Sequence, residues 1–167
     1  MPLDRPAAIR LFPDPVLRTK AQPVNRIDKA VLNAIDALEA LMRHQRHGIG
    51  IAAPQIGISR QIALVDVSAR MKGADLLILI NPVILKAWDA RPSREGCMSL
   101  PDYTAVIKRY ERVLVRWLDQ KGKRQQKLCE GIEAVCVQHE IDHLNGMLYI
   151  DRVQSLKRDM IPRQKTA

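Results

Sequence analysis

The chain has 167 residues, about the size of one ordinary domain, and such a chain buries enough surface to hold a core without disulfides. Apolar residues make up 47% and charged residues 27%, which excludes a disordered tail, a collagen-like fibre and a disulfide-rich miniprotein. The formal net charge is +9, and basic residues gather between Ala105 and Lys127 and again after Arg152. Such an excess attracts polyanions such as RNA, although a solvated surface is its more common explanation.

No segment of the sequence predicts export or insertion into a membrane. The longest apolar run, 76–85, is interrupted by Asn81 and Pro82 and is far shorter than the roughly 20 residues that a membrane span needs. The N-terminal segment MPLDRPAAIRLF lacks the apolar stretch of a signal peptide. Three widely spaced cysteines, an odd number, favour a reducing compartment. We therefore expect a cytoplasmic protein with no membrane partner, and a single domain over 1–167 that ends in a short basic tail at about 157–167.

The first predicted element is an amphipathic helix. From about Arg26 to His44, apolar residues recur at three- and four-residue steps, with Asn25 as the expected N-cap and Gly48 near the end. A loop punctuated by glycines follows this helix.

The middle of the chain predicts strands. Segment 62–67 is rich in β-branched residues, and 76–85 resembles a buried strand bent at Asn81 and Pro82. Segment 113–118, in which Val113, Val115 and Trp117 alternate with Leu114, Arg116 and Leu118, predicts a half-buried strand. The polar stretch RPSREGCMSLPDY, 91–103, predicts a loop, and 120–123 predicts a hairpin turn that contains glycine.

A second helix is predicted near the C-terminus. Apolar residues return to helical spacing over about 131–144, and Gly146 is placed to cap that helix. The order of elements indicates an α+β fold, with antiparallel β-sheets around this central helix and an amphipathic helix in the N-terminal part.

The strongest chemical signal lies in the second helix, in the sequence QHEIDHLNG. His139 and His143 are four residues apart, so on a helix both reach one metal ion, while Glu140 at the edge of that face is placed to act on water. The alternative, two hydrogen-bonded core histidines, does not account for the spacing, the glutamate and the inward-facing apolar stripe. Asp142 lies on another side of the helix and is expected to face solvent or to support the site.

A catalytic metal site of this kind normally has three protein ligands, so one more is needed. His44 and His47 are candidates, but both resemble exposed side chains near a helix end. Cys97 is the better candidate because a thiolate suits a borderline or soft divalent ion. The other cysteines, Cys129 and Cys136, are interpreted as small buried apolar side chains.

Three segments together resemble the peptide deformylases in their order and spacing: GIGIAAPQ at 48–55, EGCMS at 95–99 and QHEIDHLNG at 138–146. The resemblance extends over nearly the whole chain. It implies a hydrolase that removes the formyl group from the initiator methionine of nascent polypeptides.

The resemblance also implies residue roles. Cys97, His139 and His143 would bind one divalent metal ion, Fe²⁺ in this family, for which Zn²⁺ or Ni²⁺ substitutes. Glu140 would act as general base and then general acid. Gln55, through its side-chain amide, and Met98, through its backbone N–H, would stabilise the oxyanion.

Substrate contacts follow from the same resemblance. Gly50 would pair with the substrate backbone, and Glu95 would hold the metal-binding region in place. The methionine side chain would enter a pocket lined by Ile49, Ile132, Val135, Cys136 and the ring of His139.

Two alternatives remain open at this stage. A related metal-dependent N-acyl hydrolase or peptidase of the same fold would carry the same motifs, because the depth of the pocket decides the substrate. A non-catalytic RNA-binding module rests on the charge alone, and aromatic residues for base stacking make up only 4% of the chain.

The composition of the tail bears on whether the protein binds ribosomes. Bacterial relatives often end in a long basic helix that resembles a ribosome anchor, whereas Pro162 interrupts any helix through this tail. We therefore expect a monomer with weak ribosome or RNA association through its basic surface. We also expect residues after Arg158 to contribute little to catalysis, because they offer little to bury.

Overall fold

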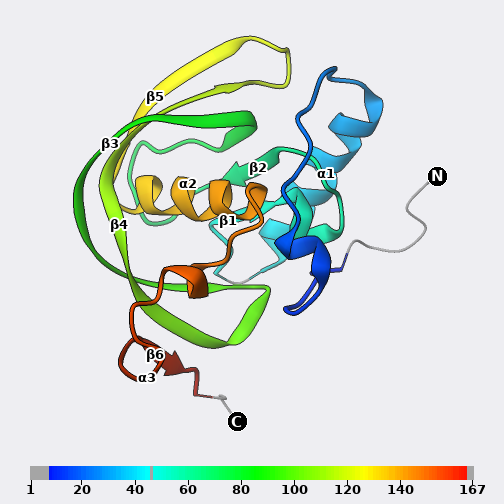
Figure 1. The fold of residues 1–167 in the computed structure, drawn as a ribbon. Coiled ribbons are helices and arrows are strands. Elements are labelled where there is room, and N and C mark those ends of the chain that lie inside the picture. The colour runs from blue at the N-terminus through cyan, green and yellow to red at the C-terminus, as the bar shows by residue number, and fades with distance from the viewer. Residues whose placement is uncertain (1–7, 46, 165–167) are drawn as a thin grey trace.

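The computed structural model describes residues 8–45 and 47–164, in which a curved antiparallel sheet wraps around one central helix (Figure 1). The elements in chain order are η1 (Pro15–Arg18), α1 (Lys29–His44), β1 (Gly50–Ala52), η2 (Ala53–Ile56), β2 (Ile62–Val65), β3 (Leu77–Cys97), β4 (Leu100–Leu118), β5 (Arg124–Glu130), α2 (Gly131–Leu144), η3 (Tyr149–Arg152), α3 (Leu156–Asp159) and β6 (Met160–Pro162). The expected α+β class with antiparallel pairing is confirmed. No helix in the described ranges is both long and apolar enough to cross a membrane.

The sheet has the strand order β1-β2-β3-β4-β5, and β6 pairs separately with the start of β4. The long strands β3 and β4 form a curved ribbon, and α2 lies on its concave side (Figure 1). The predicted bend in β3 is confirmed, because Asn81 has a φ of 51° and the pairing register shifts between Ile80 and Val83. The turn predicted at 120–123 is also confirmed, and the Asp119 N–H donates to the carbonyl of Lys123 over 2.9 Å.

Helix α1 begins three residues later than predicted. Asp28, not Asn25, is its N-cap, because an Asp28 carboxylate oxygen accepts a 3.0 Å hydrogen bond from the Val31 N–H. The apolar face of α1 is buried and belongs to the same core cluster as β1 and β2 residues. That packing fixes one wall beside the segment that carries Gly50 and Gln55.

Helix α2 runs from 131 to 144 as predicted, and most of its residues are buried, charged ones included. Strand β5 turns directly into α2 at Gly131, whose φ of 56° is a conformation that glycine adopts without strain. At the other end the Gly146 N–H donates to the carbonyl of His143 over 3.1 Å, so the predicted cap is confirmed. The helix that carries the histidines is therefore held at the centre of the fold.

The prediction of a loop at 91–103 is wrong. Strand β3 continues to Cys97, the chain turns at Met98 and Ser99, and β4 starts at Leu100. Cross-strand pairing overrides the low strand propensity of this segment. Pro92 is tolerated because β3 beyond Ile80 pairs with β4 alone among the described strands, which leaves it an open edge.

The expectation that residues after Arg158 bury little holds only in part, because Asp159 is buried and Met160 and Ile161 are half-buried, whereas 162–164 are exposed. Strand β6 pairs with β4 from Ala105–Met160 to Tyr103–Pro162, and Met160 packs against a small core cluster around Tyr149. Backbone pairing with β4 thus holds the short apolar strand β6, which polar residues flank on both sides. Residues 165–167 lie outside the described residues.

Candidate metal centre

A cleft of about 720 Å³ opens between the β1 segment, α2 and the turn that joins β3 to β4. We call this hollow the cleft. Eleven of the twelve residues to which the resemblance assigns roles line it: Ile49, Gly50, Gln55, Glu95, Cys97, Met98, Ile132, Val135, Cys136, His139 and Glu140. The remaining one, His143, is 1% exposed and contacts Cys97.

Three possible ligand atoms converge at the floor of the cleft. One atom each from Cys97, His139 and His143 lies within 4.8 Å of the others, and Cys97 Sγ is 3.3 Å from His143 Nε2. The end of β3 supplies the cysteine, while the four-residue spacing on α2 supplies both histidines. One sulfur and two imidazole nitrogens suit a divalent transition-metal ion with an open position for water or substrate.

The electrostatics separate Cys97 from the other cysteines. Burial favours the neutral thiol, but the charge of His143 and hydrogen bonds from both histidines hold the pKa of Cys97 well below its usual value. Burial and the nearby Glu140 raise the pKa of Cys136 well above its usual value, and its thiol donates to the Ile49 carbonyl over 3.3 Å. Burial, followed by the charge of Glu133, raises the pKa of Cys129 to about 12. Cys97 alone of the three therefore favours the thiolate that a metal needs.

Glu95 orients His139. The Nδ1 atom of His139 lies 2.8 Å from a Glu95 carboxylate oxygen, which leaves Nε2 as the nitrogen available to an ion. Burial would raise the pKa of Glu95, but hydrogen bonds from His139 and Arg109 lower it. A carboxylate on the far nitrogen fixes the tautomer and the ring plane of a metal-binding histidine.

A buried ionic network extends behind Glu95. The Arg109 guanidinium binds Glu95 at two points and reaches Asp142 over 2.6 Å, and Arg152 binds the other side of Asp142. Asp142 is 6% exposed, so the expectation that it faces solvent is wrong and its supporting role is the one the packing favours. Sequence reasoning missed Arg109, although it lies among the buried odd-numbered positions of β4.

Glu140 is a buried carboxylate with a free oxygen. The residue is 3% exposed, and its Oε2 atom has no hydrogen-bond partner among the described residues. Burial raises the pKa of Glu140 to about 7, so the carboxyl is suited to take and return a proton near neutral pH. The orphaned oxygen beside three converging ligand atoms indicates that the residues fit a metal ion and its water.

Gly50 makes room for this carboxylate. A Cβ atom at Gly50 would lie 2.5 Å from Glu140 Oε1 and 2.6 Å from Cys136 Sγ. No side chain fits between β1 and α2 at this point, so the backbone of β1 approaches the Glu140 carboxylate closely.

The Gln55 side chain is held at both ends of its amide. Its Oε1 accepts a 3.0 Å hydrogen bond from the Ala52 N–H, and its Nε2 donates to Ser99 Oγ over 3.1 Å. The same Nε2 lies 3.6 Å from Cys97 Sγ, so its N–H groups face the converging ligand atoms. Ser99 was not identified from the sequence, where a serine in a turn carries no distinctive signal.

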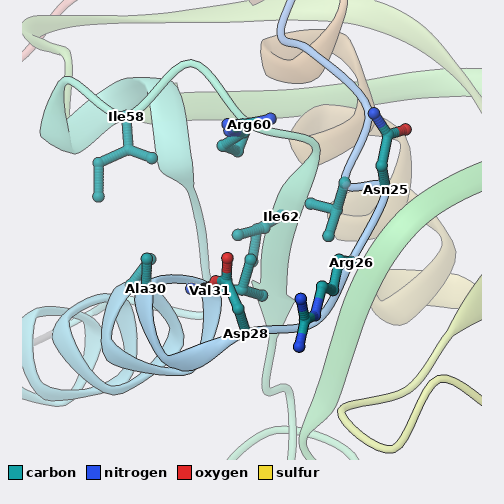
Figure 2. Close-up of a pocket in the computed structure, with 10 residues that line it drawn as sticks. Asn25, Arg26, Asp28, Ala30, Val31, Ile58, Arg60 and Ile62 are labelled. Carbon is teal, nitrogen blue, oxygen red and sulfur yellow. Dashed lines mark hydrogen bonds between the residues drawn. The ribbon is translucent and has the colours of Figure 1, made fainter.

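A second hollow, of about 380 Å³, lies beside the start of α1. Arg26 and Asp28 approach it from the segment that leads into α1, and Ile58, Arg60 and Ile62 face them from the other side (Figure 2). Its only carboxylate among the lining residues, that of Asp28, caps α1. The residues that line it include no cysteine or histidine, whereas Cys97 and His139 line the cleft.

The family model for polypeptide deformylases matches residues 6–159. The chain belongs to the polypeptide deformylase family. Family members remove the formyl group from the methionine that begins a nascent polypeptide, so this chain is a metal-dependent amide hydrolase of that kind. The peptide deformylase of Mesorhizobium japonicum is 42% identical over 155 residues, which cover 92% of this chain and 88% of that protein.

Solved structures agree with this assignment. The peptide deformylase of Thermotoga maritima matches with a TM-score of 0.82 and 38% identity, over 90% of this chain and 99% of that one. A deformylase structure from Acinetobacter baumannii with bound Met-Ala-Ser matches with a TM-score of 0.80 and 31% identity, over 87% and 96% of the two chains.

The geometry favours Cys97 over His44 and His47 as the third possible metal ligand. Cys97 joins His139 and His143 in one cluster, and neither His44 nor His47 belongs to it. His47 lies instead on the lining of the cleft, and His44 is exposed at the end of α1.

Proposed function

We propose that Cys97, His139 and His143 hold a ferrous ion and that Glu140 handles the proton while the formyl group of an N-formylmethionyl peptide is hydrolysed. The observation that carries this proposal is the convergence of three ligand atoms beside one buried carboxylate whose second oxygen is free. A bound divalent ion supplies Lewis acidity and lowers the pKa of water to near neutrality.

The chain's own residues divide the proton transfers and the charge between them. Glu140 takes the proton of the attacking water and returns it to the methionine nitrogen as the C–N bond breaks, which yields formate and a free amine. The carbonyl oxygen becomes negatively charged, and the Gln55 amide, already fixed by Ala52 and Ser99, donates a hydrogen bond to it. We assign the second donor to the backbone N–H of Met98, in the turn between β3 and β4.

The methionine side chain would occupy the apolar part of the cleft. Ile132, Val135 and Cys136 present one face of α2, and Ile49 lies opposite, where its carbonyl accepts the Cys136 thiol. An unbranched, flexible side chain would make dispersion contacts with this surface, whereas a carboxylate would find no polar partner there. We further propose that Gly50 pairs with the substrate backbone.

We propose that the protein acts in the cytoplasm, because its proposed substrates are nascent chains that emerge from ribosomes. We further propose that it works there as a monomer and associates weakly with ribosomal RNA. The outward positions of β4 support this partner, because Lys108, Arg112 and Arg116 lie on that face together with Tyr110. Binding to ribosomes should fall steeply as salt rises, and the triple variant of these cations to Gln should weaken it while turnover stays unchanged.

The substrate experiment distinguishes a deformylase from a broader hydrolase. Metal-loaded protein should release formate from formyl-Met-Ala-Ser, act far more slowly on the acetyl analogue and leave internal peptide bonds intact. The reason is that a formyl carbon carries only a hydrogen, so it approaches the oxyanion donors more closely than an acetyl carbon, which carries a methyl group. Equal kcat/KM values for the formyl and acetyl peptides would instead show an N-acyl hydrolase of broader specificity.

A further inference from the structure

We propose that Arg163 forms a carboxylate-binding subsite in the cleft, which favours formylated peptides that carry an acidic residue soon after the methionine. The inference rests on the proposed hydrolysis of formyl peptides, and it assigns a role to the C-terminal segment. It concerns the selection of substrate and leaves the chemistry at the metal centre as described.

Strand β6 positions Arg163. The residue directly follows β6, and its backbone N–H donates to the carbonyl of Asp102 over 2.8 Å. Its guanidinium lies over Gly96, where an added Cβ would overlap Nη2 and would lie 3.2 Å from Cζ. Gly96 directly precedes the ligand Cys97, so the guanidinium lies one residue along β3 from the metal centre.

The guanidinium has no acidic partner among residues 8–45 and 47–164, although it lines the cleft. The two carboxylates in the cleft lining are already committed, because Glu95 binds Arg109 and His139, and Glu140 faces the metal centre. Arg94, on the same wall, adds a second positive charge. The wall beside Gly96 therefore presents positive charge with donors free for a ligand.

A carboxylate matches this site in charge and shape. The planar fork of an arginine binds both oxygens of a carboxylate at once. With the formyl group at the metal and the methionine side chain against α2, the rest of the peptide must leave along the cleft. An extended chain advances about 3.3 Å per residue, so the second and third residues of the substrate come within reach of a long arginine side chain.

The test uses matched formyl peptides that differ in one charge. Formyl-Met-Asp-Ala-amide and formyl-Met-Ala-Asp-amide are compared with their Asn counterparts on the metal-loaded protein. We expect the Asp peptide of at least one pair to have a kcat/KM higher by about 2- to 5-fold, through a lower KM, because a partly exposed ion pair is of this strength. Formyl-Met-Ala-Ala as the free acid and as the amide shows whether a terminal carboxylate is bound in the same way.

Variants locate the effect. Arg163→Gln should reduce the Asp-to-Asn ratio to about one without changing kcat for the Asn peptides, and Arg163→Lys should keep part of the ratio. Lys157→Ala, which removes one exposed charge from the same C-terminal segment, should keep all of it. Metal content and circular dichroism confirm that each variant is folded.

The results that would contradict the subsite differ from those that would contradict the proposed function. A ratio of one in the unmodified protein, or an unchanged ratio in Arg163→Gln, would overturn the subsite. Absence of turnover with every formyl peptide would instead contradict the proposed function.

Discussion

Arg109 and Glu95 form a buried, two-point ion pair, with Nε–Oε2 at 2.7 Å and Nη2–Oε1 at 2.9 Å. Glu95 in turn binds His139, so an arginine on β4 acts on a proposed metal ligand of α2 through one carboxylate. The strand pairing that brings β3 and β4 together is thus also what fixes the orientation of the His139 ring.

Replacement of Arg109 should destabilise the fold strongly. Arg109→Met would leave Glu95 and Asp142 as buried charges without their shared partner, which costs about 3–5 kcal/mol. Arg112→Met is the matched control on the same strand, because its pair with Asp89 is exposed and such pairs contribute less than about 1 kcal/mol. Urea unfolding of the two variants measures the difference, and equal losses would show that the network is not structurally important.

Replacement of Cys97, but not of Cys129 or Cys136, should remove the metal. Cys97→Ala should give folded protein that retains little metal, because a three-ligand site depends on each ligand. Cys129→Ala and Cys136→Ala should bind about one ion per chain, since the pKa of each thiol is raised and Cys136 donates to a carbonyl. The metal content of protein purified without air checks this, and full occupancy in Cys97→Ala would remove Cys97 from the ligand set.

A methyl group at Gly50 should impair turnover while metal binding persists. The added Cβ collides with the Glu140 carboxylate and the Cys136 thiol, so Gly50→Ala must displace the carboxylate that is proposed to transfer the proton. We expect kcat/KM to fall about tenfold or more, as a displacement near 1 Å costs even more in some enzymes. Gly73→Ala, where a Cβ meets nothing within 4 Å, should lower stability slightly through its φ of 81° and leave turnover unchanged.

Loss of the Gln55 amide should lower kcat without loss of metal. Gln55→Ala removes one donor to the developing oxyanion, which corresponds to a fall of roughly 10²-fold or more. Ser99→Ala is informative beside it, because it frees the Gln55 amide on one side and should reduce kcat less. Wild-type kcat in Gln55→Ala would assign the oxyanion to other donors.

The sequence predicted which side chains lie together at the cleft better than it predicted the strands. A motif with fixed spacing on one helix determines where two histidines point, so the proximity of His139, His143 and Glu140 followed from local geometry alone. Arg109 and Asp142 did not, because their partners lie on β3 and α2 at distant positions in the chain and only tertiary pairing brings them together.

Two of the errors have a common physical cause. Segment 91–103 has the composition of a loop, yet pairing between β3 and β4 makes most of it strand, and β6 forms in the same way from three residues of a mainly polar tail. Backbone hydrogen bonds to a neighbouring strand leave little trace in the sequence of the segment itself. The start of α1 was misplaced for a more local reason, because either Asn25 or Asp28 is a suitable cap.

The most direct test of the account is the Glu140→Gln variant, with metal content and formate release measured on the same sample. The amide keeps the shape of the side chain but cannot take the proton, so the protein should bind about one ion per chain while kcat on formyl-Met-Ala-Ser falls by roughly 10²–10⁴-fold. Loss of the metal would make Glu140 a ligand instead of a base. Full metal content with unchanged turnover would contradict the assignment of the proton transfer to this buried carboxylate.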